Sequence, residues 1–296
     1  MRFNQNFPSE IRHLLRNHAR TFALTLAILP QSLREPLGLA YLLARVSDTI
    51  ADAGRIRRER RIALLEELDA TLVGKCPGIW QPRILPGELS DNERELMNSV
   101  PKLLAALKRS PERDEVTSLW KSIVEGQRFD LTRFPSEAAL GRDELERYCG
   151  LVAGSVGEYW TTLIVKYSPR SLLDSKEEMK RLGCGYGKGL QLLNILRDRS
   201  EDRFLGRRYV EEGDLAELFE LAEAWLRSGE KYLAGLRPGR LLMATALPYD
   251  LAMRTLRKIK RYPKAAGIRI PRREVRSALV RSVTCLCLPR RMNPAS

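Results

Sequence analysis

A chain of 296 residues in which 44% are hydrophobic and 30% are charged is typical of a globular protein with a sizeable core. The longest stretch without a charged residue runs from Thr21 to Leu33 and includes Pro30, whereas a membrane-spanning helix needs about 20 apolar residues. The N-terminal sequence also lacks the apolar segment and cleavage site of a secretory signal. We therefore expect a cytoplasmic protein without a transmembrane segment.

The net charge of +14 favours negatively charged partners. Nucleic acid, anionic lipid and phosphorylated substrates all meet this condition, and composition alone does not choose among them. The five cysteines are odd in number and lack the spacing of a zinc site, which indicates reduced thiols.

Helical signals dominate the chain, and no convincing strand pattern interrupts them. Ser90 and Ser175 each precede a glutamate by three residues, the capping-box pattern that begins a helix. Ser110 followed by Pro111 is a second kind of helix start. The predicted helices cover residues 9–18, 21–29, 32–53, 56–73, 91–108, 111–131, 142–166, 176–204, 212–234, 239–261 and 272–287.

Residues 76–90 contain three prolines and two glycines and are predicted to form a loop. Because neither flank is predicted to form a core by itself, we expect one all-α domain over residues 1–296. Residues 263–296 form a basic C-terminal segment. Their charge suits peripheral contact with anionic lipid at the inner membrane surface.

Two predicted helices carry a narrow polar stripe on an otherwise apolar surface. In both, the stripe residues are three or four positions apart and end in two aspartates one turn apart. The first stripe comprises Tyr41, Arg45, Asp48 and Asp52. The second comprises Gln191, Asn194, Asp198 and Asp202.

Two ionised carboxylates four residues apart repel each other by roughly 0.2–0.5 kcal/mol on an exposed helix, and by more when partly buried. Mg²⁺ removes this repulsion, and it usually binds one or two carboxylates together with substrate phosphates. Arginines near both stripes are suited to bind diphosphate oxygens. They are Arg45, Arg197, Arg207 and Arg208. The pattern therefore predicts Mg²⁺-dependent chemistry on a diphosphate.

Three ordered blocks of the chain resemble the squalene/phytoene synthase family, the head-to-head prenyl synthases. "RTFALTLAILPQSLREPLGLAYLLARVSDTIAD" (residues 20–52) is similar to the family's opening block. "YCGLVAGSVG" (residues 148–157) is similar to its middle signature. "GLQLLNILRDRSEDRFLGRRYV" (residues 189–210) is similar to its second aspartate motif.

The resemblance implies an all-α isoprenoid-synthase bundle of about ten or more helices around a central cavity, with the aspartate motifs on opposite walls. It implies that Tyr148 assists proton removal or cation stabilisation, and that Gly154 and Gly157 let a helix pass close to a prenyl chain. The implied Mg²⁺ ligands, which also count as catalytic, are Asp48, Asp52, Asp198 and Asp202. The implied substrate-binding residues are Arg20, Thr21, Phe22, Tyr41, Arg45, Gln191, Asn194, Arg197 and Arg207.

The reaction implied by the resemblance joins two farnesyl diphosphates to presqualene diphosphate. In squalene synthases a reductive rearrangement with NADPH follows. The first motif, Asp-Thr-Ile-Ala-Asp, and the block "ATALPYDLAMRTL" (residues 244–256) resemble the squalene-forming members. The stretch "YPKAAGIRIPRRE" (residues 262–274) is similar to their segment associated with NADPH.

Several departures keep other products open. Glu211 stands where the family usually has proline, and Leu193 where threonine is common. Met243 and Ala244 replace the aromatic residue that usually precedes the block at 244–256, and this change bears on the reductive step. The alternatives are a phytoene or dehydrosqualene synthase, or a presqualene diphosphate synthase without the reductive step.

More distant alternatives account for less of the sequence. Head-to-tail prenyl synthases and terpene cyclases typically show an Asp-Asp-x-x-Asp motif, and neither stripe contains adjacent aspartates. A helical nucleic-acid-binding protein would explain the charge but not the aspartate pairs, which repel phosphate in the absence of metal. We therefore expect no nucleic-acid partner.

Overall fold

The computed structural model describes residues 9–19, 22–74, 80, 81, 84–263, 270, 271 and 273–275. Within these residues the chain is all-α, as the sequence predicts, and β structure is limited to one isolated bridge between Leu172 and Leu236. The chain forms two compact units, residues 1–24 with 31–135 and residues 25–30 with 136–296. The single domain over residues 1–296 stays a prediction.

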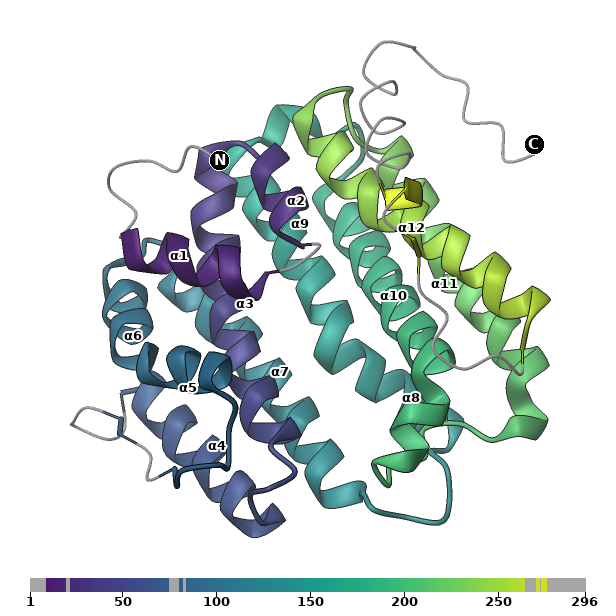
Figure 1. Ribbon diagram of the computed structural model, residues 1–296. Coiled ribbons are helices and arrows are strands. Elements are labelled where there is room, and N and C mark those ends of the chain that lie inside the picture. Colours follow the sequence, from purple (N-terminus) through teal and green to yellow (C-terminus); the bar gives the residue numbers. More distant parts are fainter. Residues whose placement is uncertain are drawn as a thin grey trace. The chain divides into compact units, whose positions relative to one another are not determined.

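The first unit is built around α3, which packs against α1, α4, α6 and α7 (Figure 1). Its helices are α1 (Ser9–His18), α3 (Gln31–Asp52), α4 (Arg58–Leu72), α5 (Asp91–Asn98), α6 (Val100–Arg109) and α7 (Arg113–Arg133). The short helix α2 (Phe22–Ile28) is divided between the units. Leu42, Leu43 and Ile50 of α3 are fully buried, which stabilises the fold by about 1.5–3 kcal/mol for each side chain.

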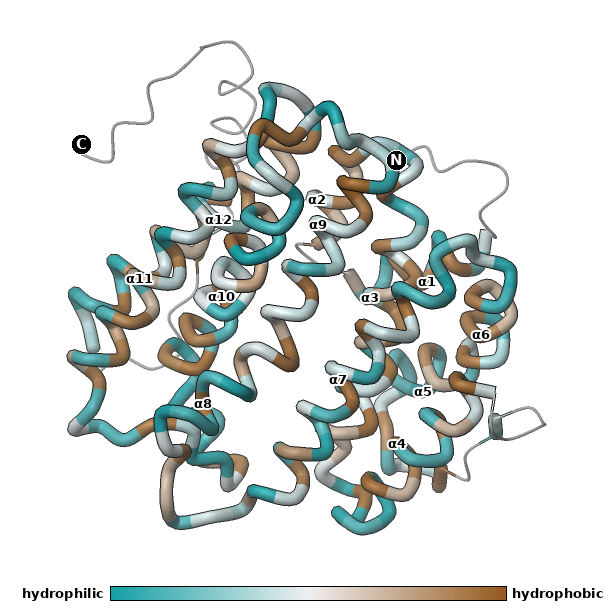
Figure 2. The backbone as a smooth tube through the Cα atoms, turned by 180° about the vertical axis from the view of Figure 1, so that it is seen from behind, coloured by the Kyte–Doolittle hydropathy of each residue, from teal (hydrophilic) through white to brown (hydrophobic). Residues whose placement is uncertain are grey.

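The second unit is built around α10, which packs against α8, α9, α11 and α12 (Figure 1). Its elements are α8 (Arg142–Cys149), the π-helical turn η1 (Gly150–Gly154), α9 (Ser155–Tyr167), η2 (Pro169–Ser171), α10 (Lys176–Phe204), η3 (Glu212–Asp214), α11 (Leu215–Ala234) and α12 (Arg240–Arg261). Figure 2 shows hydrophobic and hydrophilic residues intermixed along α10 and α11, the pattern of helices with one buried face. No helix in the described part of the chain is long and apolar enough to cross a bilayer.

Glycines let α9 and η1 approach α10 at backbone distance. A Cβ atom added to Gly157 would lie 1.9 Å from the carbonyl oxygen of Gly183, and one added to Gly187 would lie 2.1 Å from that of Ala153. A Cβ on Gly154 would meet Cys184 Sγ at 2.9 Å. The sequence-based reason for Gly154 and Gly157 was therefore wrong, because the close neighbour is α10 and not a prenyl chain.

Two predicted helices are interrupted. The helix predicted over residues 91–108 is divided into α5 and α6 at Ser99, whose hydroxyl donates to the carbonyl of Leu96 at 2.6 Å. Pro101 follows in the first turn of α6, a position that proline tolerates because the amide there needs no partner within the helix. The helix predicted over residues 142–166 contains the wider π-helical turn at Gly150–Gly154.

Some predictions fall wholly or partly outside the described residues. Of the helix predicted over residues 272–287, only residues 273–275 are described, and they are helical. Most of the basic segment at residues 263–296, with its predicted lipid contact, lies outside the description, as do residues 75–79, 82 and 83 of the loop region. Residues 84–90 are not helical, in agreement with the predicted loop.

The glycine contact gives a stability prediction. We expect Gly157→Ala to lower the free energy of unfolding by about 1–3 kcal/mol, because the added methyl group meets the backbone of α10. Urea unfolding followed by circular dichroism measures this loss. Gly150→Ala is the control, since no neighbouring atom lies within 4 Å of its added Cβ. Equal losses in both variants would contradict the proposed contact.

Candidate active site

The first aspartate pair lies in the last two turns of α3. Its stripe residues Tyr41, Arg45 and Asp48 are partly exposed and Asp52 is exposed, whereas Val46 between them is fully buried. The helix thus directs its apolar side chains into the core of the first unit. The carboxylates remain accessible to a ligand from solution.

The carboxylate of Asp48 already has polar neighbours. Gln127 of α7 donates a hydrogen bond from Nε2 to Asp48 Oδ1 at 2.5 Å. Arg45, one turn earlier on α3, has a guanidinium nitrogen 3.8 Å from Asp48 Oδ2. A neutral donor and a cation therefore stabilise the ionised form of Asp48 on two sides. Nothing in the local sequence identifies Gln127 as a neighbour, because it is 79 positions away in the chain.

Tyr41 connects the stripe to the N-terminal segment. Its hydroxyl donates to the carbonyl oxygen of His18 at 2.8 Å, and its ring stacks on Phe22 with centroids 4.9 Å apart. These contacts fix the side chains of two predicted substrate-binding residues. The predicted residues Arg20 and Thr21 lie outside the described residues.

The second aspartate pair lies in the last two turns of α10. This helix begins at Ser175, whose hydroxyl accepts from the amide of Glu178 at 3.2 Å. Its stripe residues are all partly exposed, whereas Leu192, Leu193, Ile195 and Leu196 between them are buried. The stripe consists of Gln191, Asn194, Asp198 and Asp202.

Arg197 compensates the charge of Asp198. Its Nε donates to Asp198 Oδ1 at 2.7 Å, and a second, shorter contact joins its terminal nitrogen to Asp198 Oδ2. This hydrogen bonding to Asp198 raises the pKa of Arg197 above its usual value. Guanidinium groups form two-pronged contacts of this kind with carboxylates and also with phosphates. Arg197 is therefore suited to move between Asp198 and a phosphate group.

A tight turn at the end of α10 brings the following residues back beside Asp202. Gly206 adopts a left-handed backbone with φ 79°, and its amide bonds to the carbonyl of Arg203 at 3.0 Å. The amide of Arg207 bonds to the carbonyl of Asp202 at 2.8 Å. These two hydrogen bonds form a Schellman cap, which needs a residue that tolerates positive φ. The cap places Arg207 next to the last turn of α10.

Tyr148 meets another tyrosine in the second unit. Tyr148 at the end of α8 and Tyr209 after α10 are both buried, and their hydroxyl oxygens are 3.3 Å apart. Their rings stack with centroids 5.2 Å apart. The role of Tyr148 stays a prediction, and the sequence analysis did not single out its neighbour Tyr209, although Tyr209 lies in the block that resembles the second aspartate motif.

The two aspartate pairs lie in different units, and each fits a hard divalent cation by its donor type. Among the described residues, no group of three or more His, Cys, Asp or Glu side chains forms a ready-made metal cage. Mg²⁺ does not require one, because it keeps several waters and shares its remaining positions with carboxylates and substrate phosphates. Two accessible carboxylates on one helix face, with an arginine beside them, match that mode of binding.

A family model described as squalene/phytoene synthase matches residues 15–217, well over half of the chain and including both aspartate pairs and Tyr148. The chain belongs to the squalene/phytoene synthase family. The match confirms the resemblance of the three sequence blocks.

Individual relatives within the family differ in their products. Presqualene diphosphate synthase from Botryococcus braunii is 27% identical over 203 residues, covering 69% of this chain and 46% of that protein. Squalene synthase ERG9 from Gibberella zeae is 26% identical over 274 residues, covering 83% of this chain and 57% of that protein. Phytoene synthases also match. The chain spans about half the length of the first curated relatives that it matches.

A solved structure shares the fold. The structure of TcSQS in complex with the ligand BPH1237 has a TM-score of 0.72 to this chain at 23% sequence identity. The match covers 93% of this chain and 86% of the TcSQS chain. The likeness confirms the predicted all-α fold.

The hydrogen bond between Gln127 and Asp48 gives a pH-dependent prediction. In Gln127→Glu, a second carboxylate lies beside that of Asp48, and the repulsion between them raises the pKa of the pair in the folded state. The folded state is therefore less stable at pH values where both carboxylates are ionised. We expect a loss of about 1–2 kcal/mol in the free energy of unfolding at pH 7.5, which shrinks at pH 4. Urea unfolding at both pH values measures it.

Gln127→Met serves as the control for that experiment. It removes the hydrogen bond without adding a charge, so its loss of stability is expected to be smaller than that of Gln127→Glu at pH 7.5 and to change less between the two pH values. A Gln127→Glu loss that does not depend on pH would contradict the close approach of Gln127 and Asp48.

Proposed function

We propose that the protein joins two molecules of farnesyl diphosphate head to head to form presqualene diphosphate, and then converts this intermediate to squalene with NADPH. The observation that carries the proposal is the pair of aspartate stripes. Each is accessible to solvent on a helix that buries apolar side chains in its unit, and each has an arginine in contact with an aspartate. Relatives named squalene synthase and presqualene diphosphate synthase support the reaction type.

The diphosphate groups are bound by the two stripes. We assign Asp48, Asp52, Asp198 and Asp202 as the residues that would hold Mg²⁺, which when bound supplies positive charge to the leaving diphosphate. Guanidinium groups add donors for the diphosphate oxygens, and the amides of the second stripe add neutral ones. In this assignment the arginines are Arg45, Arg197 and Arg207, and the amides are Gln191 and Asn194. Loss of diphosphate leaves an allylic cation, so the charge on the departing group is what these residues must stabilise.

In this proposal, Tyr148 and Tyr209 assist the removal of the proton that is lost when the cyclopropane ring closes. Closing the cyclopropane ring of presqualene diphosphate releases one proton and one diphosphate. The contact between the two hydroxyl groups at 3.3 Å restrains the orientation of both phenols. A positioned phenol oxygen assists proton removal or stabilises a neighbouring cation. Burial of both side chains limits the access of water, which would otherwise capture the cation.

The choice of squalene as the product rests on sequence resemblance. Asp-Thr-Ile-Ala-Asp (residues 48–52) and the block at residues 244–256 resemble the squalene-forming members of the family. The segment associated with NADPH, residues 262–274, lies mostly outside the described residues. Met243 and Ala244, which replace an aromatic residue, favour a second candidate that stops at presqualene diphosphate. A phytoene or dehydrosqualene synthase is the remaining alternative.

Product analysis tests the proposal. The protein is incubated with Mg²⁺ and either farnesyl diphosphate or geranylgeranyl diphosphate, with and without NADPH, and the extracted products are identified by mass spectrometry. We expect presqualene diphosphate without NADPH and squalene with it. Accumulation of presqualene diphosphate even with NADPH would contradict the assignment of squalene as the product. It would still support the head-to-head condensation. Phytoene formed from geranylgeranyl diphosphate, with farnesyl diphosphate inert, would contradict the substrate assignment.

Asp48→Asn and Asp202→Asn are the controls for this assay. Each removes one carboxylate and keeps the size of the side chain. We expect turnover to fall by orders of magnitude while the circular dichroism spectrum is unchanged. Turnover near that of the unmodified protein in either variant would overturn the metal assignment.

A further inference from the structure

A row of aromatic and aliphatic side chains begins at Tyr148 and runs along η1 and α9. Tyr148, Val152, Val156 and Trp160 recur every four positions, so they share one side of the helix. Val152 and Trp160 are partly exposed, and Val156 is 38% exposed. The row contains no charged residue. It is distinct from the face of α9 that packs against α10 through Gly157.

The row leads away from the second aspartate pair. Gly157 of α9 faces Gly183 of α10. One turn earlier on the α9 side, Ala153 faces Gly187, which lies one turn later on α10. The two helices therefore run in opposite directions. Because the aspartates occupy the last two turns of α10, Tyr148 is the end of the row nearest to them.

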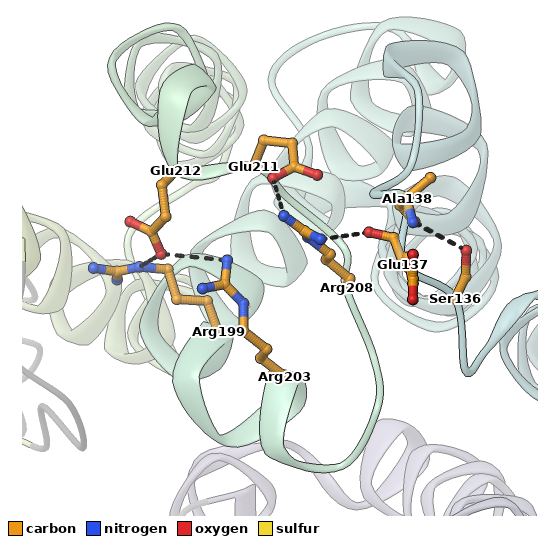
Figure 3. A network of polar contacts seen from close by, with 8 residues as sticks. All are labelled: Ser136, Glu137, Ala138, Arg199, Arg203, Arg208, Glu211 and Glu212. Atoms are coloured by element: carbon orange, nitrogen blue, oxygen red, sulfur yellow. Dashed lines mark hydrogen bonds and ion pairs between the residues drawn. The ribbon is translucent and has the colours of Figure 1, made fainter.

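Charged side chains gather around the end of α10 instead. Arg199 and Arg203 each lie within 4 Å of Glu212, and Arg208 donates to Glu211 (Figure 3). A prenyl diphosphate has the same division, since its head is charged and its chain is apolar. With the head at the aspartate pair, the chain is directed along the row.

Trp160 ends the accessible part of the row. Ile164, one turn further along α9, is only 1% exposed. The indole Nε1 of Trp160 is buried and forms no hydrogen bond with any group in the described part of the chain. The indole is therefore held by packing, and what it contributes at this position is bulk.

The length of the row matches a farnesyl chain. Tyr148 and Trp160 are twelve positions apart, about 18 Å at 1.5 Å per residue. A helical side chain covers the turn before its own Cα atom, so the indole begins nearer to Tyr148 than its backbone does. Single carbon–carbon bonds are about 1.5 Å long, so an extended isoprene unit advances about 5 Å. Three units thus reach the indole from a carbon beside Tyr148, and a fourth overlaps it.

We propose that Trp160 limits the length of the prenyl chain that this protein accepts, because its indole excludes the fourth isoprene unit of geranylgeranyl diphosphate. The inference rests on the proposed function and assigns its preference for farnesyl diphosphate to one side chain. A small residue at position 160 leaves room for the fourth unit. A large residue at Val156, one turn earlier in the row, excludes the third.

Binding of unreactive analogues tests the proposal without relying on turnover. Farnesyl thiodiphosphate and geranylgeranyl thiodiphosphate are titrated into the protein in the presence of Mg²⁺, and isothermal titration calorimetry gives both affinities. We expect the unmodified protein to prefer the farnesyl analogue by about tenfold or more, and Trp160→Ala to lose this preference. Trp160→Phe, with a side chain of intermediate size, is expected to retain part of it.

Trp225→Ala is the matched control. Trp225 of α11 is also partly exposed, but it lies outside the row, and the amine of Lys188 is 4.6 Å from the centroid of its ring. We expect this variant to keep the preference for the farnesyl analogue, even where it lowers stability. Val156→Phe adds bulk at an exposed position, so the protein should fold and bind the farnesyl analogue about tenfold more weakly.

The outcomes distinguish this inference from the proposed function. If Trp160→Ala keeps the full preference, or the unmodified protein binds both analogues equally, the length limit is wrong and the proposed condensation stands. If Trp160→Ala does not fold, unchanged farnesyl binding in Val156→Phe overturns the role of the row. A changed oligomeric state in Trp160→Ala, with the preference kept, would assign the row to a second copy of the chain and also overturn the proposal. If the unmodified protein binds neither analogue, the proposed function itself fails.

Discussion

Two ionised carboxylates one turn apart on a packed helix repel each other, and the surroundings of both aspartate pairs depend on how that repulsion is compensated. In α3, Gln127 and Arg45 contact Asp48 from different elements. In α10, Arg197 contacts Asp198 through two nitrogens. All of these partners are side chains that can be shared with phosphate or replaced by a cation. These contacts therefore reduce the repulsion within each pair in the absence of a ligand.

Close packing on the other faces holds the second pair in place. Gly157 and Gly183 bring α9 and α10 to backbone contact, and the π-helical turn before α9 begins two residues after Tyr148. A wider turn inside a helix changes the direction in which neighbouring side chains point, and such turns are frequent at functional sites. The glycine contact and the π-helical turn thus relate the position of Tyr148 to that of α10. The Schellman cap at Gly206 likewise relates the chain that leads to Tyr209 to the end of α10.

Much of this architecture could be predicted from the sequence because its causes are local. The stripe of α10 and its start at Ser175 follow from helical spacing and capping, and the structure places α10 at residues 176–204, as predicted. The division at Ser99 and the π-helical turn were missed, since the apolar pattern continues through both. Gln127 and Tyr209 contact Asp48 and Tyr148, which are 79 and 61 positions away in the chain, so helical spacing does not predict these contacts.

We propose above all that both aspartate pairs bind divalent cations together with a prenyl diphosphate. A crystal structure of the protein with Mn²⁺ and the unreactive analogue farnesyl thiodiphosphate tests it most directly, because anomalous scattering locates the metal. We predict Mn²⁺ peaks bonded to Asp48 or Asp52 and to Asp198 or Asp202, with diphosphate oxygens completing their coordination. Anomalous peaks bonded to other residues, with both aspartate pairs contacting only protein and water, would contradict the account.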